Sequence, residues 1–288
     1  MEMRQLGSSG LMVSAIGMGC MPLSVPENRP SEEDAIAVIL KAVDVGITFF
    51  DTADAYCHDH TEMGHNERLI GKALSRLDSA TRSRIVVATK AGLVRPQGRW
   101  EPNGSPTHIK SSCDAALKNL GVDAIDLYQF HRPDPHVPFI ESVGAFKELQ
   151  QAGKIKHIGL SNVSVLEIEL AMSVAKMISV QNQFARNHRK PQQDGVLEFT
   201  RKHDMAFLPW SPLGGIKASK GLAAAEPFLE TLAVHHRVTP QQIVLKWMLL
   251  LSPHIIPIPG ASRKESVVSS AAAENILFKL EEFEALND

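Results

Sequence analysis

The chain has 288 residues, of which 44% are hydrophobic and 22% charged, and its formal net charge is −2. This composition is typical of a globular protein with a large core, and the lack of excess positive charge argues against a nucleic-acid or anionic-membrane partner. No apolar run approaches the roughly 18 residues of a membrane span, and the opening MEMRQLGSSG has no signal-peptide core. Three cysteines are too few for a disulfide framework. We therefore expect a cytoplasmic protein with reduced thiols.

The first elements are predicted from a glycine-bounded turn and from a helical period. The turn over residues 7–10 lies between short extended segments, which predicts a short N-terminal β-hairpin followed by a first strand over 14–19. Residues 31–46 follow as a helix, in which Ser31 and Asp34 suit a capping box and Gly46 suits a C-terminal cap. Its apolar stripe comprises Ile36, Ile39, Leu40 and Val43.

From there strands and helices alternate without a linker. Further strands are predicted over 47–51, 84–90, 124–131, 154–161, 178–183, 205–211 and 254–260. The helices between and after them are predicted over 65–77, 107–120, up to 152–153, and over 165–175, 195–203, 240–251 and 264–273. The strands look buried on both faces, so we predict an α/β fold, a closed (β/α)₈ TIM barrel that forms a single domain over residues 1–288. An open dinucleotide-binding sheet fits less well, because Pro22 stands where a GxGxxG motif needs its third glycine.

Polar side chains stand at the ends of three consecutive predicted strands. Asp51 ends the second strand, Lys90 the third and His131 the fourth, and Tyr56 follows in the loop after the second. In a barrel of this kind the chemistry lies at the C-terminal ends of the strands, and neighbouring strands are only about 4.8 Å apart. We therefore expect these four side chains to form one cluster.

The cluster has the parts of a proton donor. A tyrosine with a pKa of about 10 is a poor acid at neutral pH, but a nearby ammonium lowers that pKa. Asp51 would hold Lys90, and His131 would orient a carbonyl oxygen. A carbonyl that takes a proton on oxygen also needs a hydride on carbon, which indicates a nicotinamide cofactor. Taken singly, each residue has a plainer interpretation, as a solvated rim residue, a structural histidine or a packing tyrosine.

At this point the sequence resembles the aldo-keto reductase superfamily over nearly its whole length. The resemblance rests on GITFFDTADAY with GHNERLIGKAL, and on VVATK, DLYQFHRPD, GKIKHIGLSN, VQNQF, WSPLG and IPIPGASR in this order. It implies that Asp51, Tyr56, Lys90 and His131 are the catalytic tetrad, the same set that the strand ends indicate.

The resemblance also implies a cofactor site along the later strand ends. Ser161, Asn162 and Gln183 would bind the nicotinamide carboxamide, and Trp210 would stack on the ring. Residues Ser211, Leu213 and Gly214 would contact the pyrophosphate. Ser262 and Arg263 follow the eighth strand, where a guanidinium would pair with a 2′-phosphate and so favour NADPH over NADH.

The adenosine end of this pattern departs from the family. Serine occupies positions 266, 269 and 270, where the family commonly has Gln and Glu-Asn, and a Glu274-Asn275 pair stands five residues later. We therefore expect adenosine contacts that are weaker or rearranged: Ser266, Ser269 and Ser270 leave the choice between NADPH and NADH less firmly fixed than the nicotinamide contacts.

The substrate pocket is predicted from the loops. The loop after Lys90 is long and carries Trp100, and Met21 and Arg132 follow the first and fourth strands, so these three are the predicted substrate contacts. Residues 57–65 contain one cysteine and three histidines, but no HExxH or paired CxxC accompanies them. We therefore predict no metal.

Together these features predict an NADPH-dependent aldo-keto reductase that reduces an aldehyde or ketone to the alcohol, with Tyr56 as proton donor and a small-molecule carbonyl substrate. Two alternatives are a cofactor-binding regulatory subunit, as in potassium-channel β subunits, and a metal-dependent barrel hydrolase that uses residues 58–65. Within the enzyme class, HIGLSN, VQNQF and PLGG resemble short bacterial members that include pyridoxal reductases. The physiological substrate, the reaction direction and the oligomeric state, monomer or small homo-oligomer, stay open.

Overall fold

The computed structural model describes residues 1–287, with the backbone alone at positions 216, 217 and 223. Its centre is a seven-stranded sheet of order β11-β10-β9-β8-β5-β4-β3, in which all paired neighbours are parallel. The strands are β3 (Met18–Gly19), β4 (Phe49–Asp51), β5 (Val86–Ala91), β8 (Ile125–Phe130), β9 (Ile155–Ser161), β10 (Met177–Gln181) and β11 (Ala206–Phe207).

The extended segment 254–260 closes this sheet into a ring. On one side Ile256 N donates to the carbonyl of Phe207 and Phe207 N donates to that of His254; on the other side Gly17 N and Gly19 N donate to the carbonyls of Pro257 and Pro259. Prolines 257 and 259 have no N–H, so they return no hydrogen bond toward residues 17–19. The predicted eighth strand is therefore in place, but it forms bridges rather than a regular ladder.

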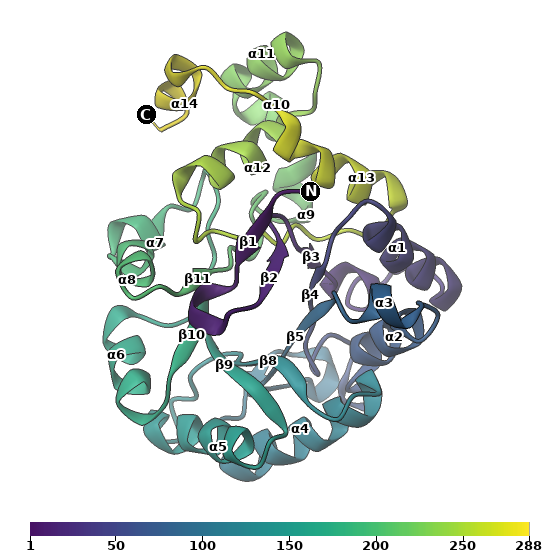
Figure 1. Cartoon of the computed structure of the whole chain (residues 1–288), viewed down its shortest axis with the longest axis vertical. Coiled ribbons are helices and arrows are strands. Elements are labelled where there is room, and N and C mark those ends of the chain that lie inside the picture. Colours follow the sequence, from purple (N-terminus) through teal and green to yellow (C-terminus); the bar gives the residue numbers. More distant parts are fainter. Residues whose placement is uncertain (288) are drawn as a thin grey trace.

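Helices surround the ring (Figure 1). The long ones that follow the strands are α1 (Glu32–Asp44), α2 (His65–Leu74), α4 (Pro106–Leu120), α5 (Phe139–Gln151), α6 (Val165–Val174), α8 (Val196–Lys202), α12 (Pro240–Leu251) and α13 (Lys264–Ala272). Together the closed ring and its helices confirm the predicted (β/α)₈ barrel.

Several further elements were not predicted. They are α3 (Ser79–Arg82), α7 (Lys190–Gln193), α9 (Ile216–Lys220), α10 (Leu222–Ala225), α11 (Pro227–His236), α14 (Leu280–Asn287) and the hairpin β6 (Leu93–Val94) with β7 (Glu101–Pro102). Helices α10, α11 and α14 project beyond the ring on one side (Figure 1). No helix of the described residues is long and apolar enough to cross a membrane.

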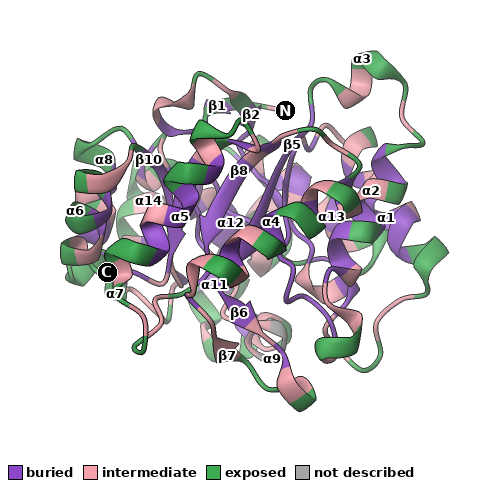
Figure 2. Cartoon of the chain, turned by 90° about the horizontal axis from the view of Figure 1, so that it is seen from below, coloured by how far each residue is buried: buried purple, intermediate pink, exposed green. Residues whose placement is uncertain are grey.

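Most of the core lies in two clusters because strand residues alternate between the two faces, and a third, small cluster joins Ile16 to Leu245 and Leu249. Residues that point outward, such as Phe50, Val87 and Tyr128, pack with the helices in the larger cluster. Residues that point inward, such as Phe49, Val86 and Leu127, fill the lower barrel in a second cluster. Both faces of the strands are thus buried, while the outer faces of the helices are exposed (Figure 2).

The predicted N-terminal hairpin covers the lower end of the barrel (Figure 1). It consists of β1 (Met3–Gln5) and β2 (Met12–Ser14), and Leu6 and Val13 join the inner core cluster. Gly7 lies so close to β10 that a Cβ there would be 2.1 Å from the carbonyl oxygen of Ile178. The predicted first strand over 14–19 is too long, because Ser14 belongs to the hairpin and only 18–19 join the sheet.

Candidate active site

Every second residue of a strand points into the barrel, and this decides which polar residues meet at the C-terminal ends of the strands, the upper rim of the barrel. Phe49 and Asp51 point the same way on β4, as do Val86, Ala88 and Lys90 on β5. The apolar members of these series lie in the lower barrel, and their polar successors Asp51 and Lys90 are 2% and 0% exposed at the top. On β8, Leu127 and Gln129 point into the barrel in the same way, and His131 follows directly after the strand.

Lys90 is the centre of the predicted tetrad. Its Nζ donates to Asp51 Oδ2 at 2.7 Å, to the Thr52 carbonyl at 2.8 Å and to the Tyr56 hydroxyl at 3.1 Å. These three acceptors use all three protons of the ammonium. Since an ammonium cannot accept, the Tyr56 oxygen is the acceptor in this pair, and the hydroxyl keeps its own proton free to donate elsewhere.

Two buried amides that the sequence analysis did not identify hold Asp51 from the other side. Gln181 Nε2 and Gln129 Nε2 donate to Asp51 Oδ1 at 2.7 and 3.3 Å. Asp51 is thus held by an ammonium on one oxygen and by two amides on the other. A glutamine within an otherwise apolar buried strand is the sequence signal that could have identified them.

Burial and charge act in opposite directions on Lys90 and Tyr56. Burial favours a lower pKa for Lys90, but the charges of Asp51 and Tyr56 outweigh it and raise the pKa. For Tyr56, burial raises the pKa above its ordinary value, and Lys90 opposes this only in part. Lys90 therefore acts on the Tyr56 pKa in the direction expected from the sequence, while burial, which the sequence did not give, acts against it.

His131 is 8% exposed and stands beside Tyr56, with ring centroids 5.8 Å apart. Burial, together with the positive charges of Lys90 and Arg132, holds its pKa well below the ordinary value. The imidazole is therefore neutral at pH 7 and carries one N–H. Its Nδ1 is buried and has no hydrogen-bond partner among the described residues.

Trp100 forms the outer wall beside these two residues. Its ring meets those of Tyr56 and His131 edge-on, with centroids 6.3 and 6.4 Å away. The guanidinium carbon of Arg95 lies 3.8 Å from the Trp100 ring centroid, and Arg95 Nη2 donates to the carbonyls of His58 and Gly98. Arg95 is only 5% exposed, so Trp100 covers a buried cation while its own outer part, 44% exposed, faces solvent.

The other two predicted substrate contacts are less closely tied to the tetrad. Met21 begins the 3₁₀ turn Met21–Leu23 above β3 and is half-buried. Arg132 is exposed next to His131, where its charge contributes to the low pKa of that imidazole. Only Trp100 makes a ring contact with Tyr56 and His131.

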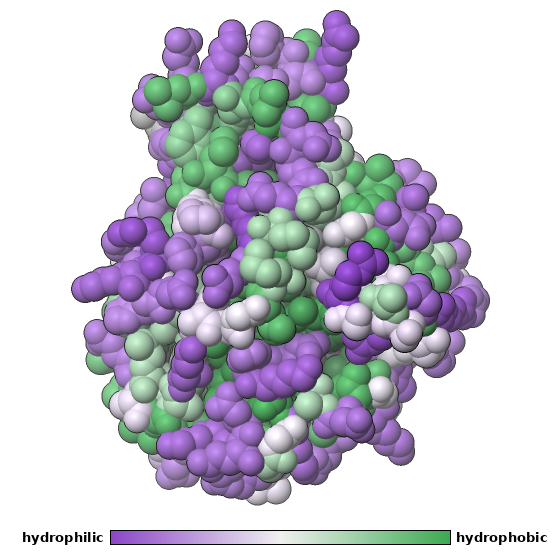
Figure 3. Space-filling model, in the orientation of Figure 1, coloured by the Kyte–Doolittle hydropathy of each residue, from purple (hydrophilic) through white to green (hydrophobic). Residues whose placement is uncertain are grey.

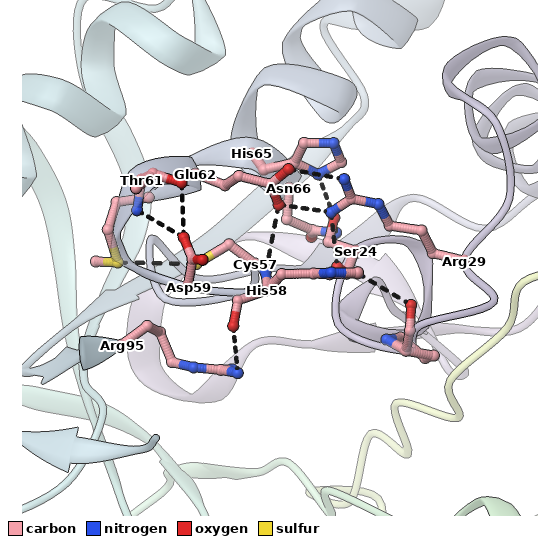
Figure 4. Close-up of polar contacts among 12 residues, drawn as sticks. Ser24, Arg29, Cys57, His58, Asp59, Thr61, Glu62, His65, Asn66 and Arg95 are labelled. Carbon is pink, nitrogen blue, oxygen red and sulfur yellow. Dashed lines mark hydrogen bonds and ion pairs between the residues drawn. The ribbon is translucent and has the colours of Figure 1, made fainter. Parts of the chain in front are cut away.

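The loop after Tyr56 is fixed by a polar network (Figure 4). Arg29 donates to both oxygens of Glu62, at 2.7 and 2.8 Å, and lowers the pKa of that carboxyl to about 2. Asn66 donates to the carbonyl of Cys20 and to the hydroxyl of Ser24. These bonds tie the loop to the segment after β3, so Tyr56 stands on a fixed support.

The histidines of residues 57–65 bind separate partners in this network. His58 Nε2 lies 3.2 Å from the Pro26 carbonyl, and His65 Nδ1 lies 2.8 Å from the Ser24 hydroxyl (Figure 4). His60 is exposed. Within the part of the chain that the structure describes, these side chains do not converge on a common point that could hold a metal ion.

The predicted nicotinamide residues form a connected row at the rim. Asn162 Nδ2 donates to the His131 carbonyl and to Ser161 Oγ, both at 3.0 Å, and Asn162 Oδ1 accepts from the Trp210 indole at 3.2 Å. Ser161 Oγ donates to the Gln181 carbonyl. The amide protons of Asn162 and the hydroxyl proton of Ser161 are therefore used within the protein, and their oxygens keep acceptor capacity.

Gln183 and the following loop are the open part of this row. Gln183 bridges Trp210 through the backbone, and its side-chain amide makes no hydrogen bond with the described residues. Asn162 and Ser211 have left-handed backbone conformations, with φ of 59° and 49°. Such conformations are uncommon for residues other than glycine and gather at ligand-binding positions. Leu213 packs on the core, and Gly214 follows with φ of 78°.

The predicted phosphate residues stand at the start of α13. Ser262 and Arg263 are exposed, and Arg263 is the residue that precedes the helix. Ser266, Ser269 and Ser270 are half-buried on this helix. Glu274 is not available as a replacement, because its carboxylate accepts from the backbone N of Glu2 at 2.6 Å, near the N-terminal hairpin.

Comparisons with known proteins place this geometry in a family. The model of the Aldo/keto reductase family matches residues 15–288. A soybean (Glycine max) protein, "Probable aldo-keto reductase 1", is 35% identical over 93% of this chain and 83% of its own length. The chain belongs to the aldo/keto reductase family. This confirms the predicted family and enzyme class, an oxidoreductase that uses a nicotinamide cofactor.

Solved structures agree with the barrel. The thermostable aldo-keto reductase Tm1743, in complex with the inhibitor epalrestat, has a TM-score of 0.85 and 29% identity over 100% of this chain and 99% of that one. An aldo/keto reductase from Klebsiella pneumoniae, in complex with NADP and acetate, has a TM-score of 0.82 and 24% identity over 100% and 95%. The family's barrel therefore extends through the whole described chain.

Proposed function

We propose that this aldo/keto reductase uses NADPH to reduce the carbonyl group of a small aldehyde or ketone, with Tyr56 as the proton donor. The observation that carries the proposal is the placement of the Lys90 ammonium, which binds the Asp51 carboxylate and the Tyr56 hydroxyl at once. A buried ammonium that donates to a phenol stabilises the phenolate left after proton transfer.

Each tetrad residue has a distinct part in the proposal. Tyr56 donates its free proton to the developing alkoxide. Asp51 and the two glutamine amides hold Lys90 in place and balance its charge. The neutral His131 donates its one N–H to the carbonyl oxygen, which polarises the carbonyl and orients it toward Tyr56. Trp100 excludes water from the outer side of this pair.

The rim residues fit a nicotinamide dinucleotide. The free acceptor positions of Ser161 and Asn162 suit the NH₂ group of a carboxamide, and the free amide of Gln183 suits its oxygen. Trp210 is held by Asn162 and offers an aromatic face for the nicotinamide ring. When bound there, the cofactor supplies the hydride that the carbonyl carbon needs.

The preference for NADPH rests on the exposed Arg263 at the start of α13. A guanidinium can bind a 2′-phosphate with two parallel charge-assisted hydrogen bonds, while NADH offers only a hydroxyl there. The positive end of the α13 dipole acts in the same direction. The K. pneumoniae protein of the same fold, solved with NADP, supports this choice.

The test is a comparison of wild type with Tyr56→Phe, using NADPH and a panel of reactive aldehydes that includes pyridoxal and sugar aldehydes. The phenylalanine variant keeps the ring that packs on Trp100 but loses the proton. Because general acid catalysis contributes about 10²- to 10⁴-fold, kcat should fall by that factor while NADPH binding, followed by fluorescence, stays unchanged. Equal turnover in the two proteins would overturn the assignment of Tyr56.

The substrate class and the partner are tested by the same panel. A clear preference for pyridoxal would support the pyridoxal reductase alternative. Tight NADPH binding with negligible turnover, and a stoichiometric protein partner on pull-down, would instead favour the regulatory subunit. We also propose that residues 1–288 act as one domain, supported by a family match that extends to residue 288.

A further inference from the structure

Two histidines and a glutamate meet far from the tetrad, between α11 and α14. His235 and His236 are the last two residues of α11, and Glu282 lies in the first turn of α14. Among the described residues that could ligate a metal ion, this is the one group of three whose donor atoms all lie within 4.8 Å of one another. Neither helix contributes to the proposed reaction.

The distances between the donor atoms are close to those between ligands of a bound metal ion. Glu282 Oε1 lies 3.0 Å from His236 Nε2 and 3.9 Å from His235 Nε2. Ligands at 2.0–2.1 Å around a tetrahedral ion are separated from one another by about 3.3 Å. Small side-chain rotations would therefore bring all three donors onto one ion, with no change in the helices.

A simple histidine–glutamate hydrogen bond does not account for the third side chain. His236 and Glu282 are 15% and 13% exposed, and a bond between them explains both. His235 is 61% exposed, yet its Nε2 approaches the same carboxylate oxygen instead of extending into water. The two imidazole rings meet nearly perpendicular, with centroids 4.9 Å apart, so their nitrogens converge on Glu282.

The surroundings of Glu282 prepare it as a ligand. Its second oxygen accepts from the backbone N of Lys279 at 2.8 Å, which fixes the carboxylate as an outer-shell partner does in metal sites. One carboxylate oxygen is therefore held in place, and the other lies near both imidazoles.

Access and surroundings complete the arrangement. An open pocket of about 390 Å³ is lined by His236, Gln242, Ile276 and Leu277 among others, and gives an ion a path to the imidazole. Apolar side chains gather on the projecting helices (Figure 3), including Phe228, Val234 and Leu280.

We propose that His235, His236 and Glu282 form a binding site for a divalent transition-metal ion of the Zn²⁺ class. Two imidazoles and one carboxylate are ligands that Zn²⁺ accepts, and the fourth position is left for water. The far end of α14 is already held by Arg186 and Arg189, which donate to the carbonyls of Leu286 and Asn287. The ion fastens the other end, so the site joins α14 to α11 and has a structural role.

The test uses the full chain freed of metal with a chelator and then titrated with Zn²⁺ against a chromophoric competitor. We expect one Zn²⁺ per chain with micromolar or tighter affinity, and a higher melting temperature with Zn²⁺. His235→Asn should weaken binding by at least the roughly 10- to 100-fold that follows from loss of an outer-shell partner; this residue is exposed and makes no hydrogen bond with the described residues that folding would lose. His60→Gln, an exposed histidine of residues 57–65, is the matched control and should bind as the wild type does.

A spectroscopic measurement identifies the ligands. Co²⁺ in place of Zn²⁺ should give the visible absorption of a four-coordinate site, and Glu282→Gln should remove that absorption. Aldehyde turnover should be unchanged in both variants. Zn²⁺ affinity equal in the wild type, His235→Asn and Glu282→Gln, or no binding below about 1 mM, would overturn the proposal.

Discussion

The two halves of the barrel's upper rim are built differently. The half that carries Asp51, Lys90 and His131 is buried, and its side chains hold one another. The half that carries the phosphate candidates is open: Ser262 and Arg263 are exposed and precede a helix without capping it through a side chain. The first half is held by its own side chains, whereas the phosphate candidates of the second are exposed to solvent.

This difference follows from what each half does in the proposed reaction. Proton transfer needs fixed distances, and fixed groups stabilise developing charge without reorganising during the step. Cofactor binding and release instead need contacts that form and break. We therefore expect substitutions in the catalytic half to affect both turnover and stability, and substitutions in the phosphate half to affect affinity alone.

The largest effect is expected for Lys90→Met. The change leaves the Asp51 carboxylate buried without its counter-ion, which costs about 3–5 kcal/mol of unfolding free energy, and removes the donor to Tyr56, so turnover should fall by about 10³-fold. Denaturant melts and steady-state kinetics measure the two effects. Lys72→Met is the matched control, because Lys72 pairs with Glu32 on the surface and should change stability by less than about 1 kcal/mol.

A double variant distinguishes the effect of the buried charge on stability from the effect of Lys90 on turnover. In the double variant Asp51→Asn/Lys90→Met the buried charge is gone, so most of the lost stability should return while turnover stays low. If turnover returned with stability, the tetrad's role would be structural, and the contrast between the two halves of the rim would fail.

The next prediction concerns how stability depends on pH through Glu67, which accepts a hydrogen bond from Thr89, the residue before Lys90 on β5. Thr89 donates to Glu67 Oε1 at 2.6 Å, and burial raises the pKa of Glu67 to about 7. The folded chain therefore binds this proton more tightly than the unfolded chain, so the contribution is complete below about pH 4.5 and is lost as the pH rises to about 7. Its size is at most on the order of 3 kcal/mol.

Denaturant melts from pH 4.5 to 8 should show this loss in the wild type and a flatter profile in Glu67→Gln. Glu148→Gln, an exposed carboxylate paired with Lys110, should follow the wild type. If the unfolding free energy of Glu67→Gln fell with pH as steeply as that of the wild type, Glu67 would not be the group that makes stability depend on pH.

Arg263→Gln probes the open half. Loss of a charge-assisted contact with the 2′-phosphate should weaken NADPH binding about 10-fold, leaving NADH binding and kcat unchanged. Fluorescence titration with both cofactors measures it, with the exposed Arg84→Gln as control. A fall in kcat, or an equal loss for NADH, would mean that the two halves are not separable.

The smallest effect is expected for Trp100→Ala. The indole forms one wall beside Tyr56 and His131, so its loss should raise KM for aromatic aldehydes a few-fold and leave KM for two-carbon aldehydes unchanged. Trp100→Phe should restore the preference in part. Equal changes for both substrate sizes would indicate that Trp100 only covers Arg95.

The sequence predicted the catalytic half well, because that half depends on local patterns. Strand alternation and the ends of the apolar runs place Asp51, Lys90 and His131, and a closed barrel brings successive ends together. Gln129 and Gln181 were missed because their partner, Asp51, lies on another strand and only the closed ring brings them to it. The effect of burial on the Tyr56 pKa was not predicted either, since burial is a property of the whole fold.

The open half and the projecting helices were harder to predict. Exposed side chains at the start of a helix leave no packing pattern in the sequence. The roles of Ser262 and Arg263 therefore remain proposals. Helices α10, α11 and α14 were not predicted, and long-range contacts hold α14, such as those of Arg186 and Arg189 with its carbonyls. The meeting of His235 and Glu282 depends on the same long-range packing.

The two prolines of the closing segment give the ring a preferred place to open. The closing segment exchanges hydrogen bonds with Phe207 in both directions, but toward residues 17–19 Pro257 and Pro259 can only accept. Local opening of a folded protein begins where the fewest bonds must break. We expect β3 and the closing segment 254–260 to separate there first, while strands β4 to β10 stay paired and keep the tetrad assembled.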